Sequence, residues 1–247
     1  MDTQLSTNSS ATESIQSSWK SIFWVGGAAA LVLLGYSLLT MISLILIGGQ
    51  PGSAQEGFSM LQNNRLLGLL RLDLPTTLVL PLYYLLLLGL YAALKKMERA
   101  PVTLAAVLGF AGITLFLSAP SALSWLALSD RFASATGEAQ KAQFLAAGEA
   151  LLAADMWHGA SALLGGLLLQ TSLLLISIVM LRGEVFGKPL AYLGILMHGL
   201  DLAHLLIGLF IPTGGVILMA IAGPLYLLWF PLIARRFFQL ADHKLAE

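Results

Sequence analysis

Six apolar stretches, each long enough to cross a lipid bilayer, dominate this sequence of 247 residues. A transmembrane helix needs about 20 consecutive, mostly apolar residues. The six stretches occupy residues 21–47, 72–94, 102–128, 151–181, 190–211 and 215–234. Leu-rich runs of this length favour helices over the alternating strands of a membrane barrel. The chain is therefore predicted to be an all-α polytopic membrane bundle with six transmembrane helices.

The composition excludes several other classes of protein. Hydrophobic residues make up 57% of the chain and charged residues 11%, against about 25% charged residues in an ordinary soluble domain. This argues against a disordered chain and against a water-soluble globule. Thirteen Lys and Arg balance thirteen Asp and Glu, so no basic field attracts nucleic acid. The absence of cysteine excludes disulfides and thiolate metal sites.

Three regions are expected along the chain. Residues 1–20 are rich in Ser and Thr and are predicted to form a disordered cytoplasmic tail. Residues 21–238 are predicted to form the six-helix transmembrane domain, and residues 239–247 a cytoplasmic C-terminal tail. The first apolar run is too long for a cleaved secretory signal, so it is expected to remain as the first helix.

The distribution of Lys and Arg predicts the orientation, since these residues gather on the cytoplasmic side. If the N-terminus is cytoplasmic, nine of the thirteen lie inside: Lys20, Lys95, Lys96, Arg99, Arg182, Lys188, Arg235, Arg236 and Lys244. Four lie outside: Arg65, Arg71, Arg131 and Lys141. Both termini are therefore predicted to be cytoplasmic, in a multi-pass protein of a prokaryotic inner membrane.

Local signals predict how some helices begin and end. Asp73, before Leu74 and Pro75, is expected to cap a helix start. Residues 138–151 are polar and rich in helix formers, and we expect them to extend the fourth helix beyond the outer surface. Pro212, Gly214 and Gly215 predict a tight outer turn between the last two helices.

The membrane stretches contain ionisable residues, which are costly at this depth and often mark a functional site. The fourth and fifth stretches each carry the spacing D-x-x-H, as Asp155 to His158 and Asp201 to His204. Positions i and i+3 lie on one face of a helix, so each Asp is expected to reach its His. His198 lies one turn before Asp201 and adds a third polar group to the fifth helix.

Helical rise places the two motifs at similar depth. His158 lies seven residues after Leu151, and His204 lies seven residues before Ile211, which puts both about 10 Å from the outer ends of their helices. The turn between these helices is short, so we expect them to be neighbours. The two motifs are then predicted to form one cluster in the outer half of the bundle. Asp73, Ser121 and Ser124 are expected in the same leaflet.

Two interpretations of this cluster stand side by side. In the first, Asp155, His158, His198, Asp201 and His204 hold a divalent metal ion or a haem. In the second, these groups join helices by hydrogen bonds, as polar side chains commonly do in membrane bundles. Arg71, near the outer interface, is expected to reach lipid phosphates.

Three segments carry a resemblance to a known family: Asn64 to Leu70 (NRLLGLL), Asp155 to Leu169 (DMWHGASALLGGLLL) and Leu181 to Gly194 (LRGEVFGKPLAYLG). Over about residues 60–238 the chain resembles a prokaryotic family of six-helix integral membrane proteins of unknown function. The resemblance implies the topology and a prokaryotic cytoplasmic membrane, and no reaction.

A second similarity is to the membrane hydrolases related to alkaline ceramidases, which use a zinc ion held by three histidines with Ser and Asp nearby. This chain has three His residues in its membrane stretches, with Asp residues and Ser121 or Ser124. It differs in helix number and lacks H-x-x-x-H.

The function expected first is a binding or accessory protein, a subunit of a membrane complex, with the lipid bilayer and other membrane proteins as its partners. A metal-dependent hydrolase is the second hypothesis, with His158, His204 and a carboxylate around the ion. A haem or pigment protein and a small proton-coupled transporter are the remaining alternatives.

Overall fold

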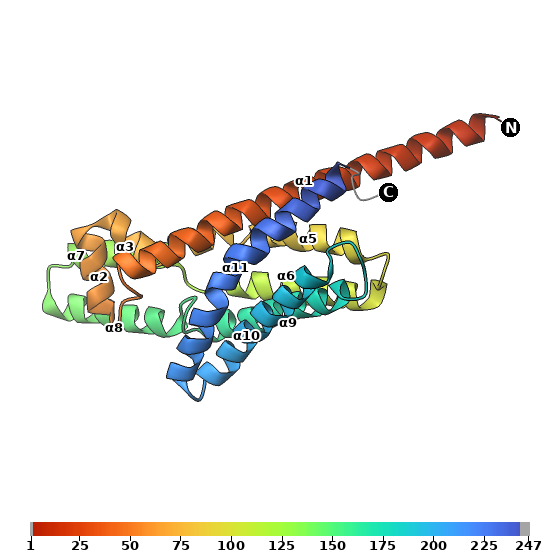
Figure 1. The fold of residues 1–247 in the computed structure, drawn as a ribbon. Helices are drawn as coiled ribbons and strands as arrows, with labels where there is room; N and C mark the ends of the chain where they lie inside the picture. The colour runs from red at the N-terminus through yellow and green to blue at the C-terminus, as the bar shows by residue number, and fades with distance from the viewer. Residues whose placement is uncertain (1, 243–247) are drawn as a thin grey trace. The chain divides into compact units, whose positions relative to one another are not determined.

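The computed structural model describes residues 2–242, with side chains from Lys20 onward. This part of the chain is helical and contains no β-strand (Figure 1). The helices are α1 (Asp2–Leu46), α2 (Ala54–Asn63), α3 (Arg65–Arg71), α4 (Leu74–Val79), α5 (Leu82–Leu94), α6 (Arg99–Leu117), α7 (Ala122–Ser134), α8 (Glu138–Ala154), α9 (Ala160–Met180), α10 (Lys188–Gly208) and α11 (Pro212–Ala241).

Five helical segments of the described chain are long and apolar enough to cross a membrane. They are α1 from Lys20, the α6–α7 segment Arg99–Ser134, α9, α10 and α11. These segments indicate a multi-pass membrane protein, as the sequence predicts. Four of them, α1, α9, α10 and α11, are single unbroken helices.

The second predicted stretch, residues 72–94, is not one helix. Asp73 has a positive φ of 58°, which places it in the left-handed region that stops a helix. A further break before Pro81 separates α4 from α5, which has 13 residues. Proline removes a backbone donor and clashes with the preceding turn, so the apolar pattern continues across a point where the helix does not.

Breaks also interrupt the third and fourth predicted stretches. Residues 118–121 separate α6 from α7, and Ser121 caps α7 by accepting a hydrogen bond from the Leu123 N–H. The prediction that residues 138–151 extend the fourth helix is wrong, because α8 ends at Ala154 and α9 begins at Ala160. The Asp155 side chain binds backbone N–H groups in this interval, and a cap of this kind competes with helix continuation.

Helices extend into both predicted tails of the chain. Helix α1 begins at Asp2, so residues 2–20, predicted as a disordered tail, are helical. Extending an existing helix costs far less than nucleating one. Of the predicted C-terminal tail, residues 239–241 continue α11. Residues 243–247, including Lys244, lie outside the described residues.

The chain divides into two compact units. Unit 1 comprises Met1–Leu34, Leu82–Gly109 and Gln170–Glu247, and unit 2 comprises Gly35–Pro81 and Phe110–Leu169. In unit 1, the Phe237 ring of α11 packs on glycines of two other helices. A Cβ atom at Gly26 of α1 would lie 3.2 Å from this ring, and one at Gly89 of α5 would lie 2.8 Å from it. Because Gly26 and Gly89 have no side chain, α1 and α5 leave room for the Phe237 ring.

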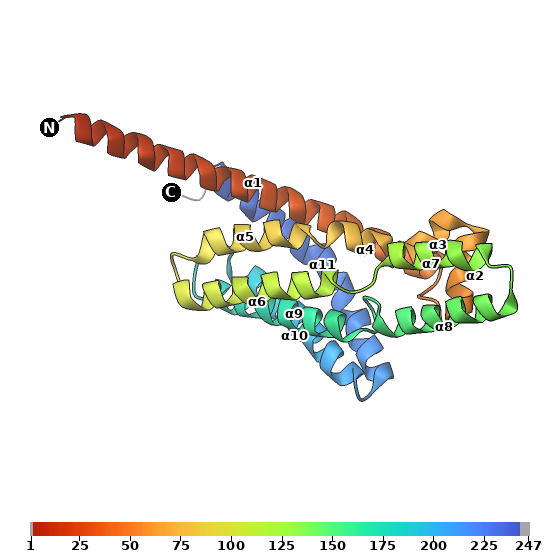
Figure 2. The same ribbon diagram turned by 180° about the vertical axis from the view of Figure 1, so that it is seen from behind.

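Unit 2 contains a small helical core formed by α2, α7 and α8, which lie together in both views (Figures 1 and 2). Phe58 of α2 and Trp125 of α7 are fully buried there, with ring centroids 5.9 Å apart. Gly57 lies against Trp125, and Gly148 of α8 lies against Phe58. Helix α2, which follows the first span, therefore shares a hydrophobic core with α7 and α8.

Helices α6 and α9 approach each other closely in unit 2, at a pair of glycines. A Cβ atom at Gly112 would lie 2.7 Å from the Gly165 carbonyl oxygen, and one at Gly165 would lie 2.7 Å from the Gly112 carbonyl oxygen. Small residues allow such backbone contact between membrane helices. A methyl group has no space here because the atoms it meets belong to the backbone.

We expect Gly112→Ala and Gly165→Ala each to lower the free energy of unfolding by about 1–3 kcal/mol, the usual cost of overpacking. The control is Gly199→Ala on α10, where nothing lies within 4 Å of an added Cβ. Alanine there should be neutral or stabilising. Equilibrium unfolding of the full chain in detergent measures all three, and equal effects at all three positions would contradict the close contact.

Candidate functional site

The first D-x-x-H motif lies in the turn between α8 and α9. Asp155 Oδ1 accepts hydrogen bonds from the backbone N–H of Trp157 at 2.9 Å and of His158 at 3.0 Å. The same oxygen accepts the Nδ1–H of the His158 ring at 3.0 Å. The predicted Asp155–His158 pair is therefore present, and it forms through a turn rather than along a helix face.

This turn changes the predicted position of His158. The residue precedes the first residue of α9, Ala160, so the depth of 10 Å predicted from a helix start at Leu151 is wrong. The His158 side chain is half exposed, whereas the Asp155 side chain is buried. The pair is thus a capped turn with one ring at the surface.

The second motif lies within a helix, as predicted. The His204 Nδ1–H donates to the Asp201 backbone carbonyl at 2.8 Å, and it lies 3.8 Å from Asp201 Oδ1. Both side chains are on the same face of α10 and are largely buried. The two side chains therefore share a face as predicted, but the hydrogen bond of the His204 ring goes to the Asp201 backbone carbonyl rather than to the carboxylate.

Asp201 also bonds to two residues that the sequence analysis did not single out. Its Oδ2 atom accepts a hydrogen bond from the Tyr226 hydroxyl of α11 and another from Gln170 Nε2 of α9, the latter at 3.1 Å. Gln170 Nε2 also donates to the Tyr226 oxygen at 3.2 Å. One carboxylate thus links α10 to α11 and to the part of α9 that belongs to unit 1, and α9 and α10 are neighbours as predicted.

The network continues to His198, one turn earlier on α10. The His198 Nδ1–H donates to Gln170 Oε1 at 2.8 Å, so Nε2 carries the free lone pair. His198 is fully buried, and within the described part of the chain its Nε2 has no hydrogen-bond partner. Trp229 Nε1 is also buried without a hydrogen-bond partner among the described residues. The Trp229 ring meets the His198 ring edge-on, with the ring centroids 5.1 Å apart. We refer to Gln170, His198, Asp201, His204 and Tyr226 as the Asp201 network.

The Asp201 network has a clear energetic role. Asp201 lies 13 residues after the start of α10, about 20 Å by helical rise. It lies seven residues before the end of this helix, about 10 Å by the same rise. On insertion scales an Asp at a helix centre costs roughly 2.5–3.5 kcal/mol. The donors from Gln170 and Tyr226 offset this cost only when α9, α10 and α11 pack together.

Asp73, in unit 2, is a second buried carboxylate. It occupies the cap position before α4, with Pro75 in the first turn, but its side chain makes no capping hydrogen bond there, so the predicted cap is present in position only. Its Oδ2 atom accepts a hydrogen bond from the Thr76 hydroxyl, which in turn contacts the Tyr36 hydroxyl of α1. Burial raises the pKa of the Asp73 carboxyl, and the Thr76 hydrogen bond partly opposes this shift. Asp73 lies outside the five candidate spans and joins α1 to α4.

Arg71, expected to reach lipid phosphates, bonds within the protein. Its Nε donates to the Gly49 carbonyl at 3.0 Å, and its guanidinium pairs with Glu56 at 3.2 Å. These contacts tie the loop after α1 to α2 and α3. The prediction for Arg71 is therefore replaced by a structural role in the loop.

The predicted metal ligands are divided between the two units. Asp155 and His158 belong to unit 2, whereas His198, Asp201 and His204 belong to unit 1. Among the residues that the structure describes, no group of three or more His, Asp or Glu side chains is placed to hold a metal ion. The meeting of the two motifs at one metal or haem therefore stays a prediction.

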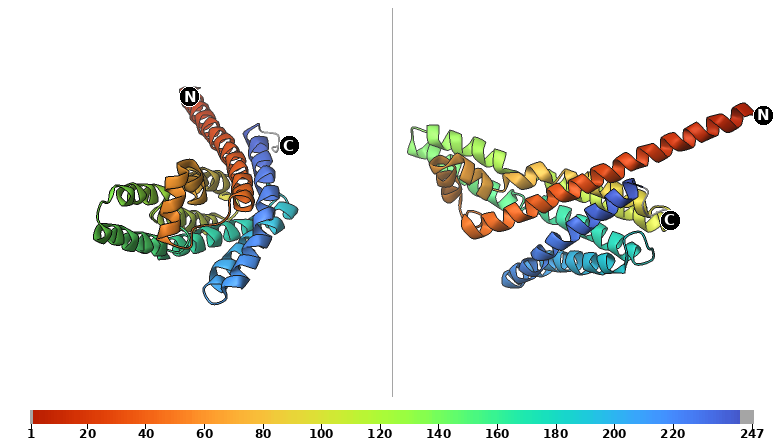
Figure 3. Two further views of the ribbon diagram at one scale, coloured as in Figure 1. Left: turned by 90° about the vertical axis from the view of Figure 1, so that its left-hand side faces the viewer. Right: turned by 45° about the horizontal axis from the view of Figure 1, so that its top comes forward.

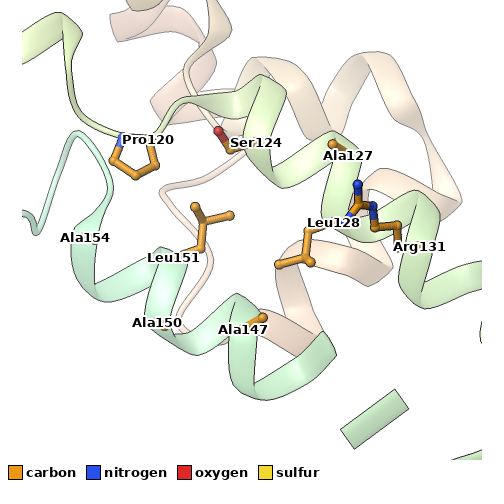
Figure 4. Close-up of a pocket in the computed structure, with 9 residues that line it drawn as sticks. All are labelled: Pro120, Ser124, Ala127, Leu128, Arg131, Ala147, Ala150, Leu151 and Ala154. Carbon is orange, nitrogen blue, oxygen red and sulfur yellow. The ribbon is translucent and has the colours of Figure 1, made fainter. Parts of the chain in front are cut away.

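A shallow groove lies elsewhere in unit 2, between α7 and α8 (Figure 4). Its volume is about 520 Å³. It is lined by Pro120, Ser124, Ala127, Leu128, Arg131, Ala147, Ala150, Leu151 and Ala154. Its walls are apolar except at Ser124 and Arg131, and neither D-x-x-H motif borders it.

Comparison of the chain with protein-family models, with curated proteins and with solved structures gives no match.

The Asp201 network predicts a measurable coupling between α10 and α11. We expect Tyr226→Phe to lower the free energy of unfolding by about 1–3 kcal/mol, because it leaves a buried carboxyl oxygen of Asp201 without one of its donors. In an Asp201→Leu background the same change should have little effect, and the double-mutant cycle isolates the coupling. Tyr192→Phe on the exposed face of α10 is the control. A Tyr226 effect that persists unchanged without the carboxylate would contradict the network.

Proposed function

We propose that this protein is a binding or accessory subunit of a membrane complex, with six crossings and both termini in the cytoplasm of a prokaryote. Five crossings are the apolar segments described above. The sixth would lie within the second apolar stretch, residues 72–94, which contains α4 and α5. Helix α5 alone has 13 residues, about 20 Å by helical rise, against a hydrocarbon core of about 30 Å, so this crossing also needs residues that precede α5. The excess of Lys and Arg on one side supports the orientation.

The α7–α8 groove carries the functional proposal. Its α7 wall consists of Ser124, Ala127, Leu128 and Arg131, and its α8 wall of Ala147, Ala150, Leu151 and Ala154. Both walls follow the spacing i, i+3, i+4, i+7, which is one face of a helix. The two helices thus expose a long, narrow apolar surface after their other faces have packed on α2.

The occupant that fits this groove best is a helix of a partner protein. Alanines at 142, 146, 150 and 154 are all exposed on α8, and small residues every four positions allow close helix approach. An apolar helix face that lies in a groove is a common mode of recognition. Arg131 is exposed at one end of the groove and has no salt bridge within the described residues. It would therefore meet an acidic residue of the partner helix.

The bonding of the ionisable groups supports binding over chemistry. In the Asp201 network, Gln170 and Tyr226 donate to the carboxylate, and both histidines use Nδ1 inside the protein. The contacts of Asp201 and His198 join α10 to α9 and α11, whereas His204 bonds to a carbonyl of its own helix. Neither D-x-x-H motif lies in the groove, so the groove has the character of a docking surface.

The natural absence of cysteine allows a direct test in native membranes. A photo-crosslinker attached at Ala150→Cys should give one protein adduct, whose partner peptide is an apolar helix with an acidic residue. The control is Leu164→Cys on α9, which is also exposed and should capture lipid. Arg131→Glu should reduce the adduct at position 150 severalfold, because it reverses the charge that the partner meets.

A second variant checks that the groove itself is required. Ala147→Trp places an indole in the groove. Its matched control, Ala153→Trp, places one at an exposed position of α8 that does not line the groove. Only the first should abolish the adduct at position 150. Equal adducts at positions 150 and 164, or an adduct unaffected by Ala147→Trp, would contradict the proposal.

A further inference from the structure

A second cavity, of different character, lies in unit 1 where α10 begins and α11 ends. Its volume is about 230 Å³. It is lined by Phe186, Gly187, Pro189, Leu190, Leu232, Arg235, Arg236 and Gln239. No acidic residue is among these lining residues. The two consecutive arginines make it basic on one side, and Phe186, Leu190 and Leu232 make it apolar on the other.

The arginines of this cavity are available to a ligand. Arg235 is exposed, and Arg236 is half-buried with its Nη1 atom 3.3 Å from Gln239 Oε1. Within the described part of the chain, neither arginine forms a salt bridge. Guanidinium groups bind phosphate through paired, charge-assisted hydrogen bonds. Gln239 holds Arg236 in place without neutralising it.

The start of α10 adds to the positive potential. Gly187 has a φ of 75°, a conformation that favours glycine, and no side chain caps the helix at this position. A Cβ atom at Gly187 would lie 3.6 Å from Arg236 Nη2, so the guanidinium lies beside the start of α10. The N-terminal end of a helix favours an anion through its dipole and its free N–H groups.

Helix length places this cavity at the membrane surface. Residues 212–234 of α11 contain no charged side chain, and these 23 residues extend about 34 Å by helical rise. The hydrocarbon core is about 30 Å thick. Arg235 and Arg236 are therefore the first charges that follow a complete crossing, at the level where lipid phosphates lie. Leu228 and Leu232, just before them, are exposed on the same helix.

We infer that this cavity binds the phosphodiester headgroup of an anionic phospholipid. The arginines and the start of α10 hold the phosphate, and the exposed leucines of α11 lie along the acyl chains. Basic pockets between membrane helices on the cytoplasmic side bind anionic lipid headgroups in this way. The site is independent of the α7–α8 groove, so either can fail without the other.

The test uses the purified full chain in a mild detergent. Binding of short-chain phosphatidylglycerol is measured by native mass spectrometry, next to phosphatidylcholine with the same chains and to inorganic phosphate alone. We expect phosphatidylglycerol to bind at least tenfold more tightly than phosphatidylcholine. Arg235→Gln with Arg236→Gln should remove this preference, and the conservative Arg235→Lys with Arg236→Lys should retain part of it.

Two further variants separate the cavity from general charge. Lys96→Gln with Arg99→Gln removes the same number of positive charges from residues outside the cavity, on the side predicted to be cytoplasmic, and should change the preference less than twofold. Gln239→Glu places a carboxylate beside Arg236 without removing either arginine. It should weaken phosphatidylglycerol binding at least fivefold while leaving the unfolding temperature unchanged or higher.

The outcomes are decisive in both directions. The site is supported if the preference for phosphatidylglycerol is lost in the Arg235/Arg236 glutamine variant and weakened by Gln239→Glu, while the Lys96/Arg99 control keeps it. Equal binding of the two lipids, or equal losses in the Lys96/Arg99 control, overturns it. Inorganic phosphate that binds alone and displaces phosphatidylglycerol at equal concentration would show a free-phosphate site and would also overturn the lipid assignment.

Discussion

The Asp201 carboxylate imposes a strict requirement on unit 1. A polar group within the hydrocarbon region must find its hydrogen-bond partners inside the protein. Asp201 finds them on two other helices, in Gln170 of α9 and Tyr226 of α11. The packing of α9, α10 and α11 is therefore fixed at one level by a single acceptor.

The helices can meet this requirement because small residues flank the network. A Cβ atom at Gly194 of α10 would lie 2.4 Å from the Ser177 hydroxyl of α9. A Cβ atom at Gly215 of α11 would lie 2.8 Å from Gly208, where the tight turn predicted from Pro212 brings α10 and α11 side by side (Figure 3). Close backbone contact on both sides thus brings the polar groups within bonding distance.

Helical class, the main apolar segments and the Asp–His pairs could be predicted from the sequence, because each follows from local composition or from spacing within four residues. The breaks before Pro81 and at residues 118–121 could not, because a proline does not always end a helix, as Pro224 and Pro231 inside α11 show. The break at 155–159 depends on which backbone groups the Asp155 side chain binds.

Gln170 and Tyr226 were missed for a different reason. Each bonds to a partner that is 25 or more residues away along the chain, which spacing within one helix cannot indicate. An isolated amide within a Leu-rich span was the available signal.

Asp201 and His198 join α10 to neighbouring helices by hydrogen bonds, and we propose that they hold neither a metal ion nor a haem. Elemental and optical analysis of the purified full chain tests this most directly. We predict a colourless protein with substoichiometric zinc, unchanged in metal content by Asp201→Asn or His204→Gln. Stoichiometric zinc or a Soret band that disappears in either variant would contradict it.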